Sequence, residues 1–125
     1  MINYNPKSIR AFIGAKNYSE SRAFYKDLGF EEIVLSSNMC LIKVNDALSF
    51  YLQDAYVKNW INNSMLFLEV DDVEKCKVDL LSRGLTEKYA TVRFTEIKEE
   101  DWGKEIFMHD PSGVLWHFGQ FNTTK

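Results

Sequence analysis

Apolar and polar residues alternate along several short stretches of this chain, which is the pattern of β-strands with one buried face. A first strand is predicted over residues 8–16, where Arg10, Phe12 and Gly14 share one face. Three more strand-like runs follow a helical segment, and the short turns between them predict a meander over residues 30–36, 39–44 and 48–53.

Two segments have helical spacing instead, and each carries signals for its start and its end. The first follows Asn17 and ends at Gly29, and the second follows Asp71 and ends at Gly84. In both, a glutamate three residues after the cap completes a capping box. The two caps and the two glycines are offset by about 54–55 residues, which indicates an internal repeat.

The second half of the chain repeats the order of the first. A strand is predicted over 64–70, a strand near 89–97, an acidic loop at 99–101, and a hairpin over 102–119 around the turn Asp110–Gly113. We therefore predict one α+β domain of two βαβββ modules, about 8–53 and 64–120. Their curved, mixed sheet of eight strands would surround a cleft, with the helices outside.

Composition narrows the classes of function. A chain of 125 residues fits a single domain. Its net charge of −3 argues against a nucleic-acid partner. There is no apolar run long enough for a membrane span and no signal-peptide pattern near the N-terminus, so we expect a cytoplasmic protein. Cys40 and Cys76 are too few for a disulfide framework or a zinc site.

Two motifs and the repeat together carry a resemblance. Residues 21–30 read SRAFYKDLGF and residues 110–113 read DPSG. In these features the chain resembles the vicinal oxygen chelate superfamily, which includes glyoxalase I, extradiol dioxygenases and bleomycin-resistance proteins. The string WGKE at 102–105, with His117 and Phe118 beyond the turn, resembles the bleomycin-resistance branch most closely.

Metal-dependent members of that superfamily place four ligands on strands. The resemblance puts these positions at Arg10, near Ser49 (or Phe50 or Tyr51, depending on register), at Met65 and at His117. An arginine cannot lose its proton to bind a metal, and a thioether does not suit the divalent ions involved. Because catalytic metal centres usually have about three protein ligands, we expect no catalytic metal and no cofactor.

The resemblance implies a small-molecule binding protein that sequesters an aromatic or amphipathic ligand, which could be bleomycin-like, as in antibiotic resistance. It also implies a homodimer with the cleft between chains, which strand exchange could build. The alternative is a glyoxalase-like enzyme, or a lyase or isomerase, with an atypical or absent metal site. Catalysis stays open, and we assign no catalytic residue.

Ten residues are expected to bind the ligand: Arg10, Phe12, Ser49, Tyr51, Trp60, Met65, Phe67, Trp102, Phe107 and His117. His117 could instead be a satisfied core histidine, and several of the apolar members could belong to the core. Arg10 needs a carboxylate partner, for which Glu69 is the candidate, or an anionic ligand. The acidic segment before Trp102 is either a solvated loop or an attractor for a cationic ligand.

Overall fold

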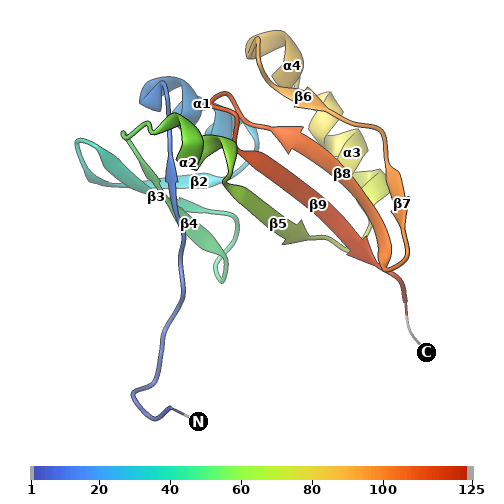
Figure 1. Cartoon of the computed structure of the whole chain (residues 1–125), viewed down its shortest axis with the longest axis horizontal. Coiled ribbons are helices and arrows are strands. Elements are labelled where there is room, and N and C mark those ends of the chain that lie inside the picture. Colours follow the sequence, from blue (N-terminus) through green and yellow to red (C-terminus); the bar gives the residue numbers. More distant parts are fainter. Residues whose placement is uncertain (1, 124–125) are drawn as a thin grey trace.

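The computed structural model describes residues 2–123 and contains two β-sheets with helices packed on one side of them (Figure 1). The first sheet has the order β1-β4-β3-β2, and the second has the order β5-β9-β8-β6, with β7 also paired to β8. We call residues 12–53 the first module and residues 65–121 the second module.

Each module begins with a strand that pairs in parallel with a strand of its later meander. The strands of the first module are β1 (Phe12–Gly14), β2 (Glu31–Ser36), β3 (Met39–Lys43) and β4 (Ser49–Gln53). Those of the second are β5 (Met65–Glu69), β6 (Arg93–Phe94), β7 (Lys98–Glu100), β8 (Gly103–His109) and β9 (Leu115–Phe121). The predicted α+β class with outer helices is confirmed, although nine strands in two sheets replace the expected eight.

The two main helices form where the capping signals predicted them. Asn17 caps α1 (Tyr18–Asp27), and its side-chain oxygen accepts a hydrogen bond from the Glu20 amide at 3.1 Å. Helix α3 (Val73–Ser82) is capped by Asp72, one residue after the predicted cap. Gly29 and Gly84 both have positive φ, as glycines that end helices usually do.

Other predicted elements were wrong in extent. Only Phe12–Gly14 of the predicted strand 8–16 is a strand, and most of 89–97 is irregular. The acidic segment is not a loop, because Lys98–Glu100 pairs with β8. Two short helices were missed, α2 (Lys58–Asn62) and α4 (Leu85–Lys88). None of the helices over residues 2–123 has the length and apolar composition needed to span a membrane.

The predicted DPSG turn joins β8 to β9 and locks the two modules together. Asp110 is fully buried, and its Oδ1 accepts three backbone N–H bonds from residues 112–114, each 2.9 Å long. Its Oδ2 accepts the Tyr25 hydroxyl of α1 at 2.6 Å, and Trp116 Nε1 donates to that hydroxyl at 3.0 Å. A carboxylate from the second module therefore anchors the helix of the first.

A second clamp lies on the helix side. Asp27, the last residue of α1, accepts the Tyr89 hydroxyl at 2.6 Å and pairs with Lys88 Nζ at 2.9 Å. These partners lower the pKa of the Asp27 carboxyl, the Tyr89 hydrogen bond contributing most. The modules are thus held side by side through their helices and turns, which leaves the opposite faces of the sheets uncovered.

Candidate functional site

The face of each sheet turned away from the helices is open, and equivalent residues form a row across it. In the first module the register aligns Phe12, Tyr51 and Leu41 across β1, β4 and β3. Equivalent strands of the second module align Phe67, His117 and Phe107. Because side chains alternate along a strand, each row lies on a single face. Tyr51, rather than Ser49, therefore occupies the position equivalent to His117.

The first patch, defined as Arg10, Phe12, Ser49 and Tyr51, is an aromatic pair beside a guanidinium. The rings of Phe12 and Tyr51 stack with centroids 4.8 Å apart. Arg10 lies against Tyr51, with its Cζ 5.7 Å from the ring centroid. Its Nε donates to Ser49 Oγ at 2.9 Å and its Nη1 donates to Tyr51 Oη at 3.1 Å. The patch is open, since 57% of Phe12 is exposed.

The second patch contains more aromatic side chains and one ionisable pair. Its members are Met65, Phe67, Trp102, Glu105, Phe107, His117 and Phe121, from β5, β8, β9 and the residue before β8. Phe67 contacts Trp102, His117 and Phe121, with ring centroids 5.7, 6.1 and 5.8 Å away. The ring of Phe107 meets His117 edge-on at 4.9 Å. These rings form a nearly continuous aromatic surface.

His117 is held in this surface from both ring nitrogens. Its Nδ1 lies 3.0 Å from Glu105 Oε1, and its Nε2 lies 3.5 Å from Met65 Sδ. Glu105 is only 6% exposed, so its carboxylate has little solvent and depends on this partner. A carboxylate on one imidazole nitrogen fixes the orientation of the ring and leaves the other nitrogen facing the open side.

A glycine makes room for the ring of Phe67 in the second patch. Gly119 pairs with Glu69 on one side and Glu105 on the other, and a Cβ added to it would lie 2.3 Å from a Phe67 ring carbon. Any other residue would therefore displace Phe67 from the patch. A glycine inside a strand often marks such a close approach.

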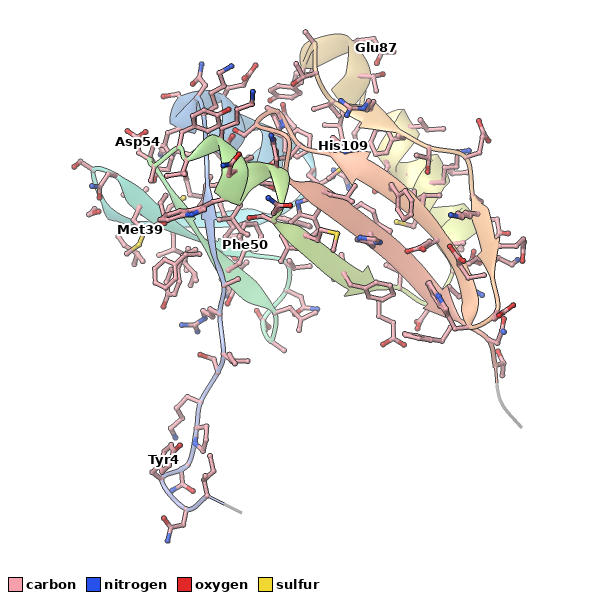
Figure 2. All side chains as sticks on the ribbon, viewed as in Figure 1. Tyr4, Met39, Phe50, Asp54, Glu87 and His109 are labelled. Atoms are coloured by element: carbon pink, nitrogen blue, oxygen red, sulfur yellow. The ribbon has the colours of Figure 1, made fainter. Side chains whose placement is uncertain are left out.

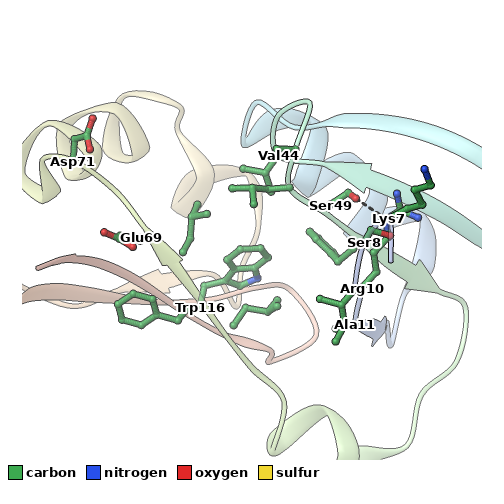
Figure 3. Close-up of a pocket in the computed structure, with 16 residues that line it drawn as sticks. Lys7, Ser8, Arg10, Ala11, Val44, Ser49, Glu69, Asp71 and Trp116 are labelled. Atoms are coloured by element: carbon green, nitrogen blue, oxygen red, sulfur yellow. Dashed lines mark hydrogen bonds between the residues drawn. The ribbon is translucent and has the colours of Figure 1, made fainter. Parts of the chain in front are cut away.

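A groove of about 760 Å³ runs between the two modules (Figure 3). Its two ends differ in charge, because Lys7 and Arg10 line one end and Glu69 and Asp71 the other. Trp116 lies between them on the floor. The first patch opens onto this groove through Arg10 and Ser49, and the second patch reaches it through Phe67.

The sequence matches no protein-family model and no curated protein, but its structure matches solved ones. One is a bleomycin-binding protein complexed with bleomycin, with a TM-score of 0.77 and 18% identity over 94% of this chain and 100% of that one. A bleomycin resistance determinant encoded on transposon Tn5 matches with the same TM-score and identity over 93% and 99%. Lactoylglutathione lyase from Agrobacterium tumefaciens matches at 0.67 and 18%, over 92% and 94%.

The chain shares its overall fold with these solved proteins. At 18% identity these likenesses establish the fold, and they agree with the sequence resemblance to bleomycin-resistance proteins and glyoxalases. What this member of the fold can bind depends on its own side chains.

Nine of the ten predicted site residues lie on the two patches. Trp60 does not: it lies on α2, is 72% exposed, and pairs with no other aromatic ring among residues 2–123. Glu105 was missed, because in the sequence it is one polar residue of an ordinary amphipathic strand. The signal that could have found it is Gly119, which pairs with Glu105 and whose missing side chain leaves room for the Phe67 ring.

The superfamily's metal positions hold a poor set of ligands in this fold. Arg10 of the first module corresponds to Met65 of the second, and Tyr51 of the first module corresponds to His117 of the second. No group of three His, Cys, Asp or Glu side chains suited to a metal occurs in the part of the chain that the structure describes. Both cysteines are also weak ligands here, since burial raises the pKa of Cys40 and raises that of Cys76 to about 11.

Proposed function

We propose that this chain is a small-molecule binding protein that sequesters an aromatic or amphipathic ligand without a catalytic metal. The main support is that the open face of each sheet has an aromatic patch with polar groups held in a fixed orientation. Apolar walls with a few fixed polar groups are the usual composition of small-molecule sites. The structural neighbours include a bleomycin-binding protein and a bleomycin resistance determinant, which supports the same class of function.

We further propose that the binding cleft forms between two copies of the chain. The two sheets lie side by side in one chain (Figure 1), so neither patch can cover the other. Large apolar side chains remain exposed on both, with Met65 62% and Phe67 47% exposed. Exposed apolar patches of this kind usually mark interaction surfaces. A two-fold dimer could place the first patch of one copy over the second patch of its partner.

The N-terminal segment supports this arrangement. Residues 2–9 extend away from the body of the fold (Figure 2), and Tyr4 and Ile9 are 75% and 99% exposed. An isolated extended segment has no buried surface to hold it in place, whereas a partner chain could supply one. Exchange of this segment between two copies is therefore part of the proposal.

One observation favours a second candidate function. The contact between Glu105 and His117 has the form of a general base oriented by a carboxylate. A glyoxalase-like, lyase or isomerase reaction could use such a pair if the ligand presented an acidic proton near Nε2. Recovery of bound ligand unchanged after long incubation, checked by mass spectrometry, would reject this alternative.

Calorimetry with bleomycin, run with a thermal-shift assay, is the first test of binding. We expect heat and a raised melting temperature for the wild type, and weaker binding for Trp102→Ala. Trp60→Ala is the matched control, because it removes the same side chain from a place outside both patches. If bleomycin and related flat drugs give neither heat nor shift, drug sequestration is rejected and a different ligand must be sought.

Light scattering tests the dimer separately. One chain has a mass of 14.6 kDa, so the proposal predicts a species of about twice that mass at micromolar concentration. Removal of residues 2–9 should shift the mass toward the monomer if the segment is exchanged. A single 14.6 kDa species for the full chain would reject the dimeric cleft.

A further inference from the structure

We infer that the ligand of the proposed cleft is an aromatic carboxylate, or a similar planar anion, and that Arg10 binds its anionic group. This inference rests on the proposed function, because it assigns the charge of the ligand to the same site. Its basis is an arginine that is oriented by neutral groups and has no acidic partner.

The side chain of Arg10 is held in place without being neutralised. A guanidinium has five N–H donors. Nε and one N–H of Nη1 are used by the hydroxyls of Ser49 and Tyr51. The second N–H of Nη1 and both N–H bonds of Nη2 make no hydrogen bond within residues 2–123, so they can donate to an anion. Neighbouring N–H groups of a guanidinium suit the two oxygens of one carboxylate.

The predicted partner of Arg10 does not contact it. Glu69 forms no ion pair with Arg10, and neither does any other acidic residue between positions 2 and 123. In Figure 3, Glu69 and Asp71 lie at the far end of the groove from Arg10. Lys7 lines the near end and adds a second positive charge. Of the two alternatives, a Glu69 partner is therefore not seen, and a cationic group placed at the Arg10 end of the groove would meet repulsion.

The neighbouring rings specify the rest of the ligand. Tyr51 both accepts a hydrogen bond from Arg10 and stacks against Phe12, so the guanidinium and the two rings form one connected surface. A flat ring laid on this surface would bring a carboxylate attached to it toward the remaining N–H groups of Arg10. The first patch thus favours an anion on an aromatic ring.

Three probes that share one ring and differ in charge test this inference: 2-naphthoate, 2-naphthamide and 2-naphthylmethylammonium. Their dissociation constants are measured by calorimetry at low salt with the full chain. We expect the carboxylate to bind about tenfold more tightly than the amide, and the ammonium to bind most weakly, because the charged hydrogen bond is the difference. Arg10→Gln should remove this preference, so that the carboxylate and the amide bind with equal affinity.

Lys75→Gln is the matched control, since it makes the same charge change on the exposed outer helix α3. It should keep the preference of the wild type. Equal ratios of carboxylate to amide affinity in wild type and Arg10→Gln would overturn the inference while the proposed function stands. Failure of all three probes to bind the wild type would overturn the inference, while the calorimetry with bleomycin decides the proposed function. Loss of all binding in Arg10→Gln together with a halved mass would also overturn it, because Arg10 would then hold the chains together.

Discussion

The two modules of this chain share a backbone plan and differ in chemistry at nearly every position that faces outward. Phe12 and Phe67 occupy the same place on β1 and β5, yet the residues two positions earlier are Arg10 and Met65. Opposite each phenylalanine stands Tyr51 in one module and His117 in the other. The repeat thus conserves an aromatic anchor and changes the polar group beside it.

In the proposed dimer, this difference would give one site two unlike patches. The first patch has the guanidinium of Arg10 beside two stacked rings. The second patch has the His117–Glu105 pair within an aromatic surface. A ligand held between them would meet a positive charge on one side and a neutral or acidic hydrogen-bonding pair on the other. Neither patch alone could surround a ligand.

The turns make a second comparison, and they give the largest predicted effect. Asp110 accepts three backbone N–H bonds while fully buried, whereas Asn45 accepts two in an exposed turn of the first module. Asp110→Ala should lower the free energy of unfolding by about 3–5 kcal/mol, because buried donors lose their partner. Asn45→Ala should cost about 1 kcal/mol. Chemical denaturation measures both, and equal losses would contradict the interlocking role of the Asp110 turn.

Loss of the central aromatic ring of either patch should give the next largest effect, on ligand binding. Tyr51→Ala and Phe67→Ala each remove the ring at the centre of one patch. We expect each to weaken ligand binding by about tenfold to a hundredfold, since aromatic side chains dominate such contacts. Calorimetry with the probe that binds the wild type most tightly is the measurement. A loss confined to one of the two variants would mean that only one patch contacts the ligand.

The ion pairs that join β2 to α1 should give a smaller effect on the free energy of unfolding, and this effect depends on pH. Glu32 of β2 pairs with Arg22 and with Lys26 of α1, and the Arg22 guanidinium lowers the pKa of this carboxyl from its ordinary 4.5 to about 2. A lowered pKa stabilises the fold above pH 4.5, and this contribution is lost as the pH falls toward 2. Glu32→Gln should therefore cost about 1–2 kcal/mol at pH 7 and almost nothing at pH 2.

The control for that prediction is the exposed ion pair between Glu74 of α3 and Lys104 of β8. Glu74→Gln should change the free energy of unfolding by less than about 0.5 kcal/mol, because exposed ion pairs contribute little. Denaturation curves from pH 7 to pH 2 measure both variants. A Glu32→Gln deficit that stays constant with pH would contradict the assigned role of the carboxylate.

The sequence predicted the parts of the fold that depend on local signals. Asn17, Gly29 and Gly84 act within a few residues of themselves, so their roles as cap and terminators could be foreseen. Strand β7 could not, because its residues are all charged and lack the apolar alternation of a strand, although they pair with β8 only a few residues later. Helix α4 could not, because Tyr89 at its end is held by Asp27 of the other module, a contact that leaves no periodic pattern in the chain.

For the candidate site, the sequence predicted which residues share a face but not which polar groups contact each other. Alternation placed Phe12, Phe67 and His117 on one kind of face, and the register later confirmed that they lie there. The partners of the charged groups were not predictable, since Arg10 contacts Ser49 and Tyr51 instead of Glu69, and His117 contacts Glu105. Choosing among polar partners requires the cross-strand register, which the sequence alone does not supply.

Subunit complementation tests most directly whether the two patches of different chains form one site. Tyr51→Ala and Phe67→Ala chains, each with its own affinity tag, are co-expressed, and the mixed dimer is purified through both tags. Each pure variant should bind weakly. The account predicts that the mixed dimer regains wild-type affinity at about one site per dimer, because one cleft then has two intact patches. A mixed dimer that binds as weakly as either pure variant would contradict the shared cleft.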